Sequence, residues 1–460
     1  MSVSETNDLP PLLLEKEVST HLISTWKGDL EVKDDDDDND DKFYKLLQQL
    51  GTPPTFTTLR VNTLNTDTHD VVKQLKLELE KQYSDRGSNP PPVVLHPALK
   101  DVIVIPSRGP NTKPPEIKKE VIVDLACGMA VLRGAHVFVL GIMAAPPYLA
   151  AGELVAVYAD LEGQCRKGLK EEYKERKVYV GSGVMQLSRD QIFCAAQVKL
   201  RGVGIKMTQP LYEAPCLDEI LPEFVFAQNL PSIVCSHVLD PKPGETVIDM
   251  CASPGGKTNH IATLMKNEGR VIALDKSAAK VKKIVNNLER WDITCVECYA
   301  YDSTKCVDEK AELKGSPPYP GESFDRVLLD VPCSALGQRP SSRNRMTLKS
   351  LQSYPTYQKM FIESGVQLLK PGGTMVYSTC TFTVEENERQ VAWILDKYPE
   401  LSLVEQVPHL GDVGRPCKDL TPEQAKLLQR FDPTSVTSKS QCFTDNDTIG
   451  FFIAKFVKGS

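Results

Sequence analysis

The C-terminal half of the sequence predicts a doubly wound α/β fold built on a mainly parallel sheet. Two observations support this prediction. From about residue 213 onward, short apolar segments alternate with amphipathic ones, which is the pattern of βαβ units, and a glycine-bearing turn directly follows the first of the apolar segments. The expected strands are 246–250, 271–275, 295–300, 324–330 and 373–379, and the expected helices include 257–267, 277–291 and 356–369.

The preceding residues differ in texture and predict two more regions. Residues 1–115 are expected to form an N-terminal α+β region, with a strand at 56–62 and a helix at 68–81. Residues 116–212 carry short β-type segments separated by glycines, which is typical of a small barrel or sandwich. The basic segment at 166–177 (RKGLKEEYKERK) of this region favours contact with phosphates. Residues 213–460 complete the division as the α/β region.

The composition is that of a globular protein, with 41% hydrophobic and 25% charged residues. The sequence contains no apolar run long enough to cross a membrane, and its first fifteen residues lack the pattern of a secretory signal. Thirteen cysteines in so long a chain are typical of reduced thiols in the cytoplasm or nucleus rather than of a disulfide framework. We expect a cytoplasmic protein that binds no membrane.

A net charge of −7 is unusual for a protein that binds nucleic acid, but one acidic run accounts for it. The run comprises Asp34–Asp38, Asp40 and Asp41. Such a run repels itself and is expected to be a solvated, mobile loop without function. The alternative is a mimic of RNA phosphates that blocks the chain's own binding surface.

The strongest chemical signal is the turn after the first predicted strand, VIDMCASPGGKT. Its glycines allow close approach of a ligand, and it lies where ligands bind α/β sheets. A phosphate-binding loop would need glycine where Cys251 stands, and the dinucleotide fingerprint is absent. A ribose-bearing cofactor without a phosphate to bind, S-adenosylmethionine, fits best. The candidate cofactor-binding residues in the turn are Cys251, Ala252, Ser253, Pro254, Gly255, Gly256 and Lys257.

Acidic residues at the ends of the following strands extend this site. Asp275 is expected to accept hydrogen bonds from ribose hydroxyls, and Asp302 to contact the adenine amine. Asp330 ends the fourth strand and is assigned to the cofactor and to the reacting base. Each of these acids taken alone is also a common helix cap.

Two cysteines, Cys333 and Cys380, follow the fourth and fifth strands at the same edge of the sheet. Carbon 5 of cytosine accepts a methyl group only after a thiolate adds to carbon 6, so a cysteine suits this reaction. The thiol must ionise, and Lys257 and the cofactor's sulfonium are candidates for stabilising its charge. Asp330 is placed to protonate or hydrogen-bond ring nitrogen 3.

These motifs resemble the Sun (RsmB/NOP) class of RNA cytosine-5 methyltransferases, whose domain has the Rossmann-like fold of class I methyltransferases. The resemblance covers about residues 213–460 through DMCASPGGKT, LDKS, DVPCS with GQRP, YSTCTFTVEENE and GFFIAKF. It implies that Cys380 attacks the base and that Cys333 serves release of the methylated product. DNA cytosine methyltransferases use the Pro-Cys cysteine as the nucleophile, so the presence of both cysteines points to RNA.

The middle region resembles a PUA domain through Gly134-Ala135 before HVFVLGI, GELVAVYAD and GSGVMQLSR. Sun proteins with an inserted PUA domain form one branch, the sixth of the animal series. The chain resembles this branch, which implies methylation of the acceptor end of certain tRNAs, with the PUA domain holding the CCA tail, and of related hairpins in messenger RNA. We expect a monomer. Val331 and Ala335 replace the alanine and glycine that are commoner in this class.

Other interpretations remain open. A catalytically inactive RNA-binding module is one, although the presence of Cys380, Cys333, Asp330 and Lys257 argues against it. A ribosomal RNA cytosine-5 methyltransferase is another, and a small-molecule methyltransferase leaves the basic β-region unexplained. Cys295 and Cys298 have zinc-like spacing but no second pair, so we expect a buried strand and no metal.

Overall fold

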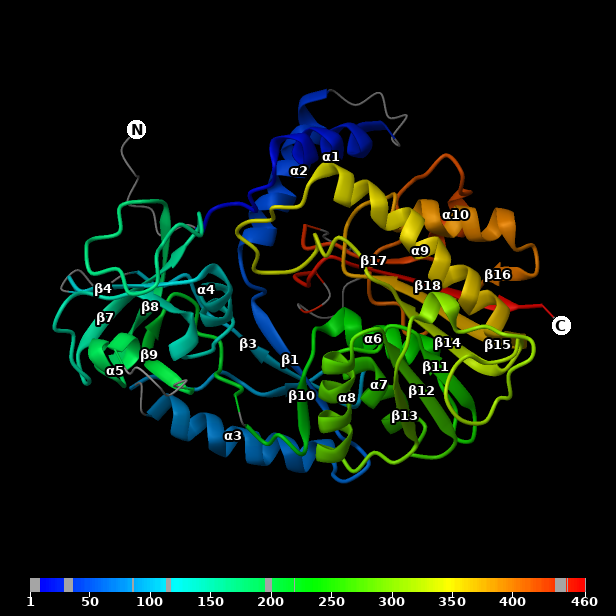
Figure 1. Ribbon diagram of the computed structural model, residues 1–460, viewed down its shortest axis with the longest axis horizontal. Coiled ribbons are helices and arrows are strands. Elements are labelled where there is room, and N and C mark those ends of the chain that lie inside the picture. Colours follow the sequence, from blue (N-terminus) through cyan, green and yellow to red (C-terminus); the bar gives the residue numbers. More distant parts are fainter. Residues whose placement is uncertain are drawn as a thin grey trace.

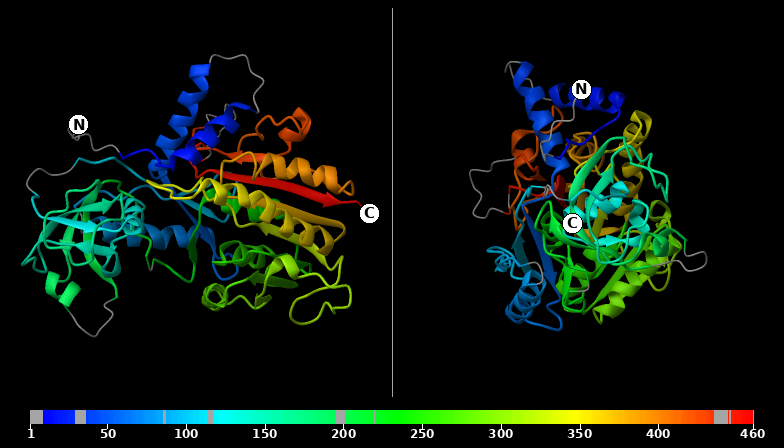
Figure 2. Two further views of the ribbon diagram at one scale, coloured as in Figure 1. Left: turned by 45° about the horizontal axis from the view of Figure 1, so that its top comes forward. Right: turned by 90° about the vertical axis from the view of Figure 1, so that its left-hand side faces the viewer.

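The computed structural model describes residues 9–28, 36–84, 87–112, 117–194, 201–218, 220–434, 444 and 446–459. Its strands form three sheets. A small sheet of the middle region lies to one side of a larger sheet of the C-terminal region, and a third sheet with helix α3 (Thr68–Ser84) lies between and below them (Figure 1). Figure 2 shows the same division from two further directions.

The large sheet confirms the doubly wound α/β prediction. Its strand order is β13-β12-β11-β14-β15-β18-β16, with β17 paired to β18. The strands from β13 to β15 are parallel, whereas β18 runs antiparallel to β15. The order reverses at β11, and in such sheets ligands bind at the carboxyl ends of the strands beside this point. The bounds are β11 (Thr246–Asp249), β12 (Arg270–Asp275), β13 (Val296–Ala300), β14 (Phe324–Asp330), β15 (Leu369–Thr379), β16 (Leu401–Leu403), β17 (Gln429–Phe431) and β18 (Phe451–Lys458).

Helices cover both faces of this sheet because successive strand residues point to opposite sides. Val247 packs in the core on the face of α6 and α7, whereas Ile248 packs in the core on the face of α9 and α10. Both faces of the strands are therefore apolar, as expected for a buried parallel sheet. The helices of this region are α6 (Leu230–Leu239), α7 (Gly256–Leu264), α8 (Ala278–Arg290), α9 (Leu348–Leu368), α10 (Glu388–Lys397) and α11 (Pro422–Lys426), with the 3₁₀ turn η2 (Ser303–Lys305).

One predicted helix has a different start. The prediction began it at residue 356, after a proline, but α9 begins at Leu348 and contains Pro355 in its interior. Thr347 caps the helix by accepting a hydrogen bond from the backbone of Ser350. Apolar residues such as Leu351 anchor the first turns in the core, so packing outweighs the local cost of the proline.

The N-terminal region supplies three strands of a four-stranded sheet and two further helices. The sheet order is β10-β1-β3-β2. Strand β10 lies beyond residue 213, where the sequence analysis placed the α/β region, yet its Ala227 is paired with Leu59 of β1. The bounds are α1 (Lys16–Gly28), α2 (Asp36–Gly51), β1 (Phe56–Val61), β2 (Val94–Leu95), β3 (Val102–Pro106) and β10 (Val225–Ala227).

The acidic run does not form the expected loop where the structure describes it. Asp34 and Asp35 lie outside the described residues, but helix α2 begins at Asp36, so residues 36–41 are helical. Acidic residues at a helix N-terminus are favoured by the helix dipole. The rest of α2 is anchored by Leu46, which packs with Leu336 and Phe382 of the α/β region.

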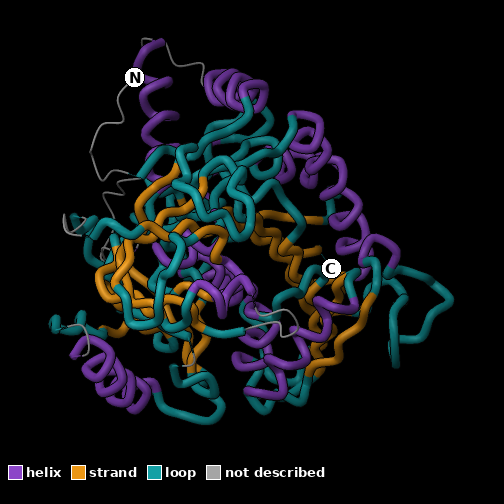
Figure 3. The backbone as a smooth tube through the Cα atoms, turned by 60° about the vertical axis from the view of Figure 1, so that its left-hand side comes forward, coloured by secondary structure: helices purple, strands orange, loops and turns teal. Residues whose placement is uncertain are grey.

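The middle region forms a six-stranded sheet with its own core. Figure 3 turns forward the side of the molecule on which this region lies in Figure 1. The strand order is β5-β9-β8-β7-β4-β6. Buried Val121, Val157 and Val180 lie in that core. Its elements are β4 (Glu120–Val123), α4 (Leu125–Leu132), β5 (Val137–Phe138), η1 (Val139–Gly141), β6 (Ile142–Ala144), β7 (Leu154–Asp160), β8 (Lys177–Met185), α5 (Arg189–Cys194) and β9 (Val203–Pro210).

Two smaller findings bear on the sequence analysis. Cys295 and Cys298 are both half-buried at β13, where Cys295 packs against the core, in keeping with a structural role. Among the described helices, none combines the length and apolar character that a membrane span requires.

Candidate active site

The predicted cofactor turn connects β11 to α7 and is fixed by its own polar contacts. Thr258 Oγ1 donates to Asp249 Oδ2 over 2.7 Å, and the Cys251 amide donates to Asp249 Oδ1 over 3.3 Å. Gly255 has φ +103°, and a Cβ there would lie 3.2 Å from Ile284. Glycine is therefore required at this position. Gly255 provides no side-chain cap for α7, so the first amides of that helix are open to a ligand.

A buried arginine of the N-terminal sheet is hydrogen-bonded to the end of this turn. Arg60 of β1 donates to the carbonyl of Gly256 over 3.1 Å and to Gln228 Oε1 over 2.9 Å. Its guanidinium lies 4.6 Å from the ring centroid of Trp291, and burial lowers its pKa to about 9. The position of the turn thus depends on a strand that precedes it by almost two hundred residues.

A cavity of about 600 Å³ opens above the turn and reaches the middle region. Six of the predicted cofactor residues line it: Cys251, Ala252, Ser253, Pro254, Gly256 and Lys257. Asp330 lies on the same wall, together with Gln338. Arg133, which follows α4 of the middle region, lines the cavity as well, so one space connects the turn with the β-region.

Three predicted cofactor residues, Gly255, Asp275 and Asp302, lie outside the lining of this cavity. Asp275 Oδ1 accepts the Ser277 amide over 2.9 Å, and Lys280 Nζ lies 3.7 Å from Oδ2. Asp275 retains capacity to accept further hydrogen bonds. Asp302 is more fully engaged, because Thr304 donates to Oδ1 and Lys276 lies 3.0 Å from Oδ2. Asp275 therefore keeps the acceptors that a ribose needs. Asp302 is a weaker candidate for accepting a hydrogen bond from an adenine amine.

Lys257 and Asp330 form an ion pair at the centre of the site. Lys257 Nζ lies 2.8 Å from Asp330 Oδ2, and Ser378 Oγ donates to Asp330 Oδ1 over 2.8 Å. Burial lowers the pKa of Lys257, but the attraction of Asp330 outweighs it and the pKa lies well above the usual value. Asp330 contacts only donors here, so it is a carboxylate that can stabilise a protonated ring nitrogen rather than deliver the proton.

The two predicted cysteines come together as expected from adjacent strand ends. Cys333 Sγ lies 3.4 Å from Cys380 Sγ, and both side chains are half-buried. A hydrogen bond from Cys333 lowers the pKa of Cys380 against the effect of burial, and Lys257 acts in the same direction as Cys333. The pKa of Cys333 is raised well above its usual value by the same hydrogen bond and by burial. The pair therefore contains one thiolate-prone sulfur, Cys380, as nucleophilic chemistry requires.

The site tolerates the unusual residue Ala335 in the loop after Cys333. Ala335 has φ +55°, a conformation that glycine, which the resemblance implies is commoner at this position, adopts without strain. Val331, the other departure, is buried in the core behind the loop. Neither change removes a reacting group.

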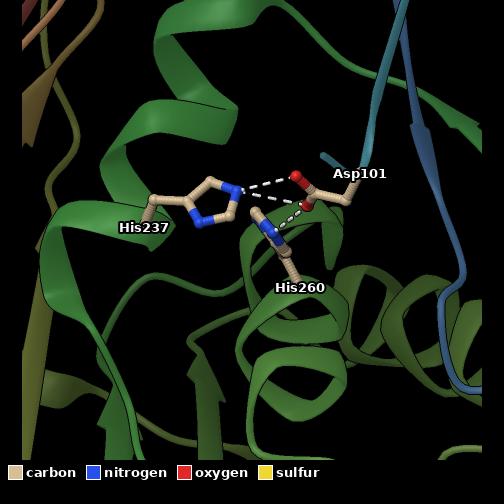
Figure 4. A group of neighbouring side chains, drawn as sticks. All are labelled: Asp101, His237 and His260. Atoms are coloured by element: carbon tan, nitrogen blue, oxygen red, sulfur yellow. Dashed lines mark hydrogen bonds and ion pairs between the residues drawn. The ribbon is translucent and has the colours of Figure 1, made fainter. Parts of the chain in front are cut away.

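A second polar cluster, which the sequence analysis missed, lies behind the turn (Figure 4). Asp101, before β3, accepts from His237 Nε2 over 2.9 Å and from His260 Nε2 over 2.9 Å. Among the described residues, these three side chains form the group with potential metal-ligand atoms close together. Both contacts have the length of ordinary hydrogen bonds. We interpret the cluster as a link between the N-terminal sheet and helices α6 and α7.

Comparison with known proteins places this arrangement in context. A family model described as 16S rRNA methyltransferase RsmB/F matches residues 236–457. The tRNA (cytosine(72)-C(5))-methyltransferase NSUN6 of Mus musculus is 44% identical over 98% of this chain and 97% of that protein. The tRNA (cytosine(72)-C(5))-methyltransferase of Pyrococcus horikoshii is 31% identical over 90% and 92% of the two chains. The rRNA (cytosine-C(5))-methyltransferase NOP2C of Arabidopsis thaliana is 32% identical over 94% and 90%.

Among solved structures, NSun6 from Pyrococcus horikoshii with SFG superimposes on this chain with a TM-score of 0.75. The two chains are 28% identical, and the match covers 97% of this chain and 99% of that one. The similarity therefore extends over all three sheets rather than over the α/β region alone.

Proposed function

This chain belongs to the Sun (RsmB/NOP) family of RNA cytosine-5 methyltransferases, and we propose that it methylates cytosine 72 at the acceptor end of tRNA. It is an S-adenosylmethionine-dependent tRNA cytosine-5 methyltransferase. The choice of position 72 follows the relatives of mouse and Pyrococcus horikoshii, which carry it in their names. The relative named for ribosomal RNA is less similar than the mouse protein.

S-adenosylmethionine supplies the methyl group when bound. The residues present fit such a ligand, because the turn combines open helix amides with a cavity wall and leaves Asp275 with free acceptor capacity. We propose that residues 251–257 hold it, with Asp275 at the ribose and Asp302 at the adenine. The solved relative was studied with SFG, an analogue of this cofactor.

The side chains above the turn support a covalent mechanism. We propose that the Cys380 thiolate forms a bond to carbon 6 of the target cytosine, which moves electron density to carbon 5. Lys257 stabilises the thiolate beforehand. Nitrogen 3 takes up a proton from water as the adduct forms, and Asp330 stabilises the protonated nitrogen. After methyl transfer, water takes the proton from carbon 5, and the electrons of that bond form the double bond between carbons 5 and 6. The bond between carbon 6 and sulfur then breaks, nitrogen 3 returns its proton to water, and Cys380 regains its thiolate. Cys333, 3.4 Å from Cys380, assists this release.

The observation that carries the tRNA proposal is the cavity shared by the cofactor turn and the middle region. We propose that residues 116–212 are a PUA domain that holds the CCA tail. Arg133 would then contact the RNA between this domain and the cofactor turn. Exposed basic residues of the same region provide phosphate contacts: Arg166, Lys167, Lys170, Lys174 and Arg176. Hairpins in messenger RNA with the same end structure are further proposed substrates.

The decisive experiment is methylation of tRNA transcripts by the purified full-length protein. Bisulfite sequencing is expected to detect 5-methylcytosine at position 72 in the intact transcript and a large loss in a transcript without the CCA tail. A transcript with uracil at position 72 serves as the matched control. Equal methylation with and without the tail would reject the role of the middle region, and methylation of ribosomal RNA alone would reject the tRNA assignment.

We further propose that the protein acts as a monomer in the cytoplasm. Every cysteine within the described residues is a free thiol, which suits a reducing compartment. We propose no role for a metal ion, since His237 and His260 each hydrogen-bond Asp101 through Nε2 at ordinary distances. Light scattering of the purified protein and fractionation of cells would detect a dimer or a nuclear pool, and either would contradict this part of the proposal.

A further inference from the structure

Glu386 lies between the two loops that carry the active-site cysteines. It belongs to the segment that joins β15 to α10, and 1% of its surface is exposed. Its carboxylate accepts four hydrogen bonds and contacts only donors, which is the pattern of an ionised group. The donors are the Ser334 amide (3.0 Å), Ser334 Oγ (2.5 Å), Thr383 Oγ1 (2.9 Å) and Gln358 Nε2 (2.9 Å).

These hydrogen bonds fix the chain on both sides of Cys333. Ser334 directly follows this cysteine and donates to Glu386 twice. Gln358 donates to Glu386 and also to the carbonyl of Pro332 over 3.1 Å, and Pro332 directly precedes the cysteine. The position of the Cys333 sulfur therefore depends on Glu386.

The same contacts connect Glu386 to the loop of Cys380. Thr383 of that loop donates to the Glu386 carboxylate. Thr381, the residue after Cys380, shares a hydrogen bond of 2.7 Å with Ser334 Oγ. We call the set Ser334, Gln358, Thr381, Thr383 and Glu386 the Glu386 network. It holds the two cysteine loops together and so maintains the separation of 3.4 Å between the sulfurs.

The Glu386 carboxylate is placed nearer along the chain to Cys333 than to Cys380, because it accepts twice from Ser334, the residue after Cys333, whereas its direct contact with the other loop is at Thr383, three residues after Cys380. The pKa of Cys333 is raised, in order of size, by the hydrogen bond to Cys380, by burial and by the charge of Cys380. The negative charge of Glu386 raises it further. The main influences on the pKa of Cys380 are instead Cys333, burial, Gln338, Asp330 and Lys257. A negative charge beside one member of a pair disfavours ionisation of that member.

We propose that Glu386 is a positioning residue that keeps the proton of the cysteine pair on Cys333 and leaves Cys380 as the thiolate. Cys333 then donates its S–H to the Cys380 sulfur, and no covalent bond is made or broken. The proposal deepens the proposed function and rests on it, because it explains why only one of two adjacent sulfurs attacks the base. The other titratable groups that face the pair are Lys257 of α7, Asp330 of β14, Tyr354 of α9 and Tyr377 of β15.

Alkylation of the free protein by iodoacetamide tests the proposal, with mass spectrometry to identify the modified cysteine at each pH. In the wild type, Cys380 is expected to react first and Cys333 to resist until higher pH. In Glu386→Gln, the ratio of the two rates is expected to fall about tenfold, which corresponds to a relative shift of about one pKa unit. Because this measurement uses no RNA, absence of methylation would reject the proposed function without affecting its result.

A matched control separates the charge of Glu386 from its structural role. Ser334→Ala removes the two hydroxyl hydrogen bonds of Ser334 from the Glu386 network, to Glu386 and to Thr381, but keeps the carboxylate and the Ser334 amide contact. It is expected to leave the order of alkylation unchanged. An unchanged rate ratio in a folded Glu386→Gln protein, verified by circular dichroism, would overturn the proposal, as would equal effects of the two variants. Should Glu386→Gln not fold, the wild type decides: preferential alkylation of Cys333 would overturn the proposal.

Discussion

Lys257 Nζ lies 2.8 Å from Asp330 Oδ2, which joins the first turn of α7 to the carboxyl end of β14. Ser378 extends the connection to β15 by donating to the other oxygen of Asp330. Three neighbouring strand ends are thus linked by one carboxylate. Since Lys257 also favours the thiolate of Cys380, the ion pair connects the cofactor turn to the nucleophile.

Replacing Asp330 by asparagine should therefore reduce both stability and rate. The variant leaves Lys257, whose side chain is 10% exposed, without its counter-charge, and breaking such a pair costs about 3–5 kcal/mol. We expect kcat on tRNA to fall roughly 100-fold or more, the usual cost of removing a group that stabilises the charge developing in the transition state. Thermal unfolding and single-turnover methylation would measure the two effects.

A matched control lies at the other end of the same strand. Asp325 pairs with Lys370 over 2.7 Å and accepts the amide of Thr246 over 2.8 Å, away from the cofactor turn. Asp325→Asn should lower stability and leave kcat unchanged. Equal losses of kcat in the two variants would show that Asp330 acts only through stability.

The two cysteines should differ when each is replaced by alanine. Cys380→Ala should abolish methylation while leaving the affinity for S-adenosylmethionine nearly unchanged, because the nucleophile is lost and the turn is intact. Cys333→Ala should instead accumulate protein covalently bound to methylated RNA. Denaturing gels would detect the adduct, and calorimetry the cofactor affinity. Cys194→Ala, an exposed thiol on α5, is the control, and residual methylation by Cys380→Ala would show that the roles are misassigned.

The sequence predicted those parts of the site whose geometry depends on neighbouring residues in the chain. The strand 324–330 is found with the same bounds as β14, and the first strand differs by one residue. The turn at Gly255 was recognisable because few residues adopt φ +103°, so its glycine signals the geometry. The pairing of Cys333 with Cys380 followed from the rule that parallel strands end at one edge.

The parts that sequence reasoning missed depend on contacts between distant residues. Asp101 meets His237 from 136 positions away, and no periodicity connects them. Arg60 lies on a strand whose apolar neighbours gave no sign that it would be buried under Gly256. Glu386 belongs to the motif YSTCTFTVEENE, but its hydrogen-bond partner Ser334 lies 52 positions away in the sequence. Only the folded chain brings these polar groups together.

Asp275 should contribute to binding of the cofactor rather than to the chemical step. Removing a carboxylate that accepts hydrogen bonds costs about 1.5–3 kcal/mol, so Asp275→Ala should raise the Kd for S-adenosylmethionine about 10- to 100-fold. The rate at saturating cofactor should be unchanged. Calorimetry and initial rates would measure the two quantities. Asp308→Ala, an exposed acid after η2, is the control, and an unchanged Kd in Asp275→Ala would exclude the ribose contact.

Acid should destabilise the protein through His260. Burial lowers the pKa of His260 from 6.5 to about 3, with Arg60 acting in the same direction and Asp101 opposing. Below pH 6.5 the unfolded chain takes up a proton that the folded chain refuses, so stability is lost as the pH falls from 6.5 toward 3. For one proton the slope approaches about 1.4 kcal/mol per pH unit.

His260→Gln should remove this part of the acid sensitivity, because glutamine can still donate to Asp101 but does not titrate. Urea unfolding of both proteins across this pH range would compare their free energies of unfolding. The wild type should lose stability more steeply than the variant, with the difference growing as the pH falls. His69→Gln, on the exposed surface of α3, should follow the wild type. Parallel curves for wild type and His260→Gln would mean that His260 takes up its proton in the folded protein as readily as in the unfolded chain, contrary to the effect of its burial.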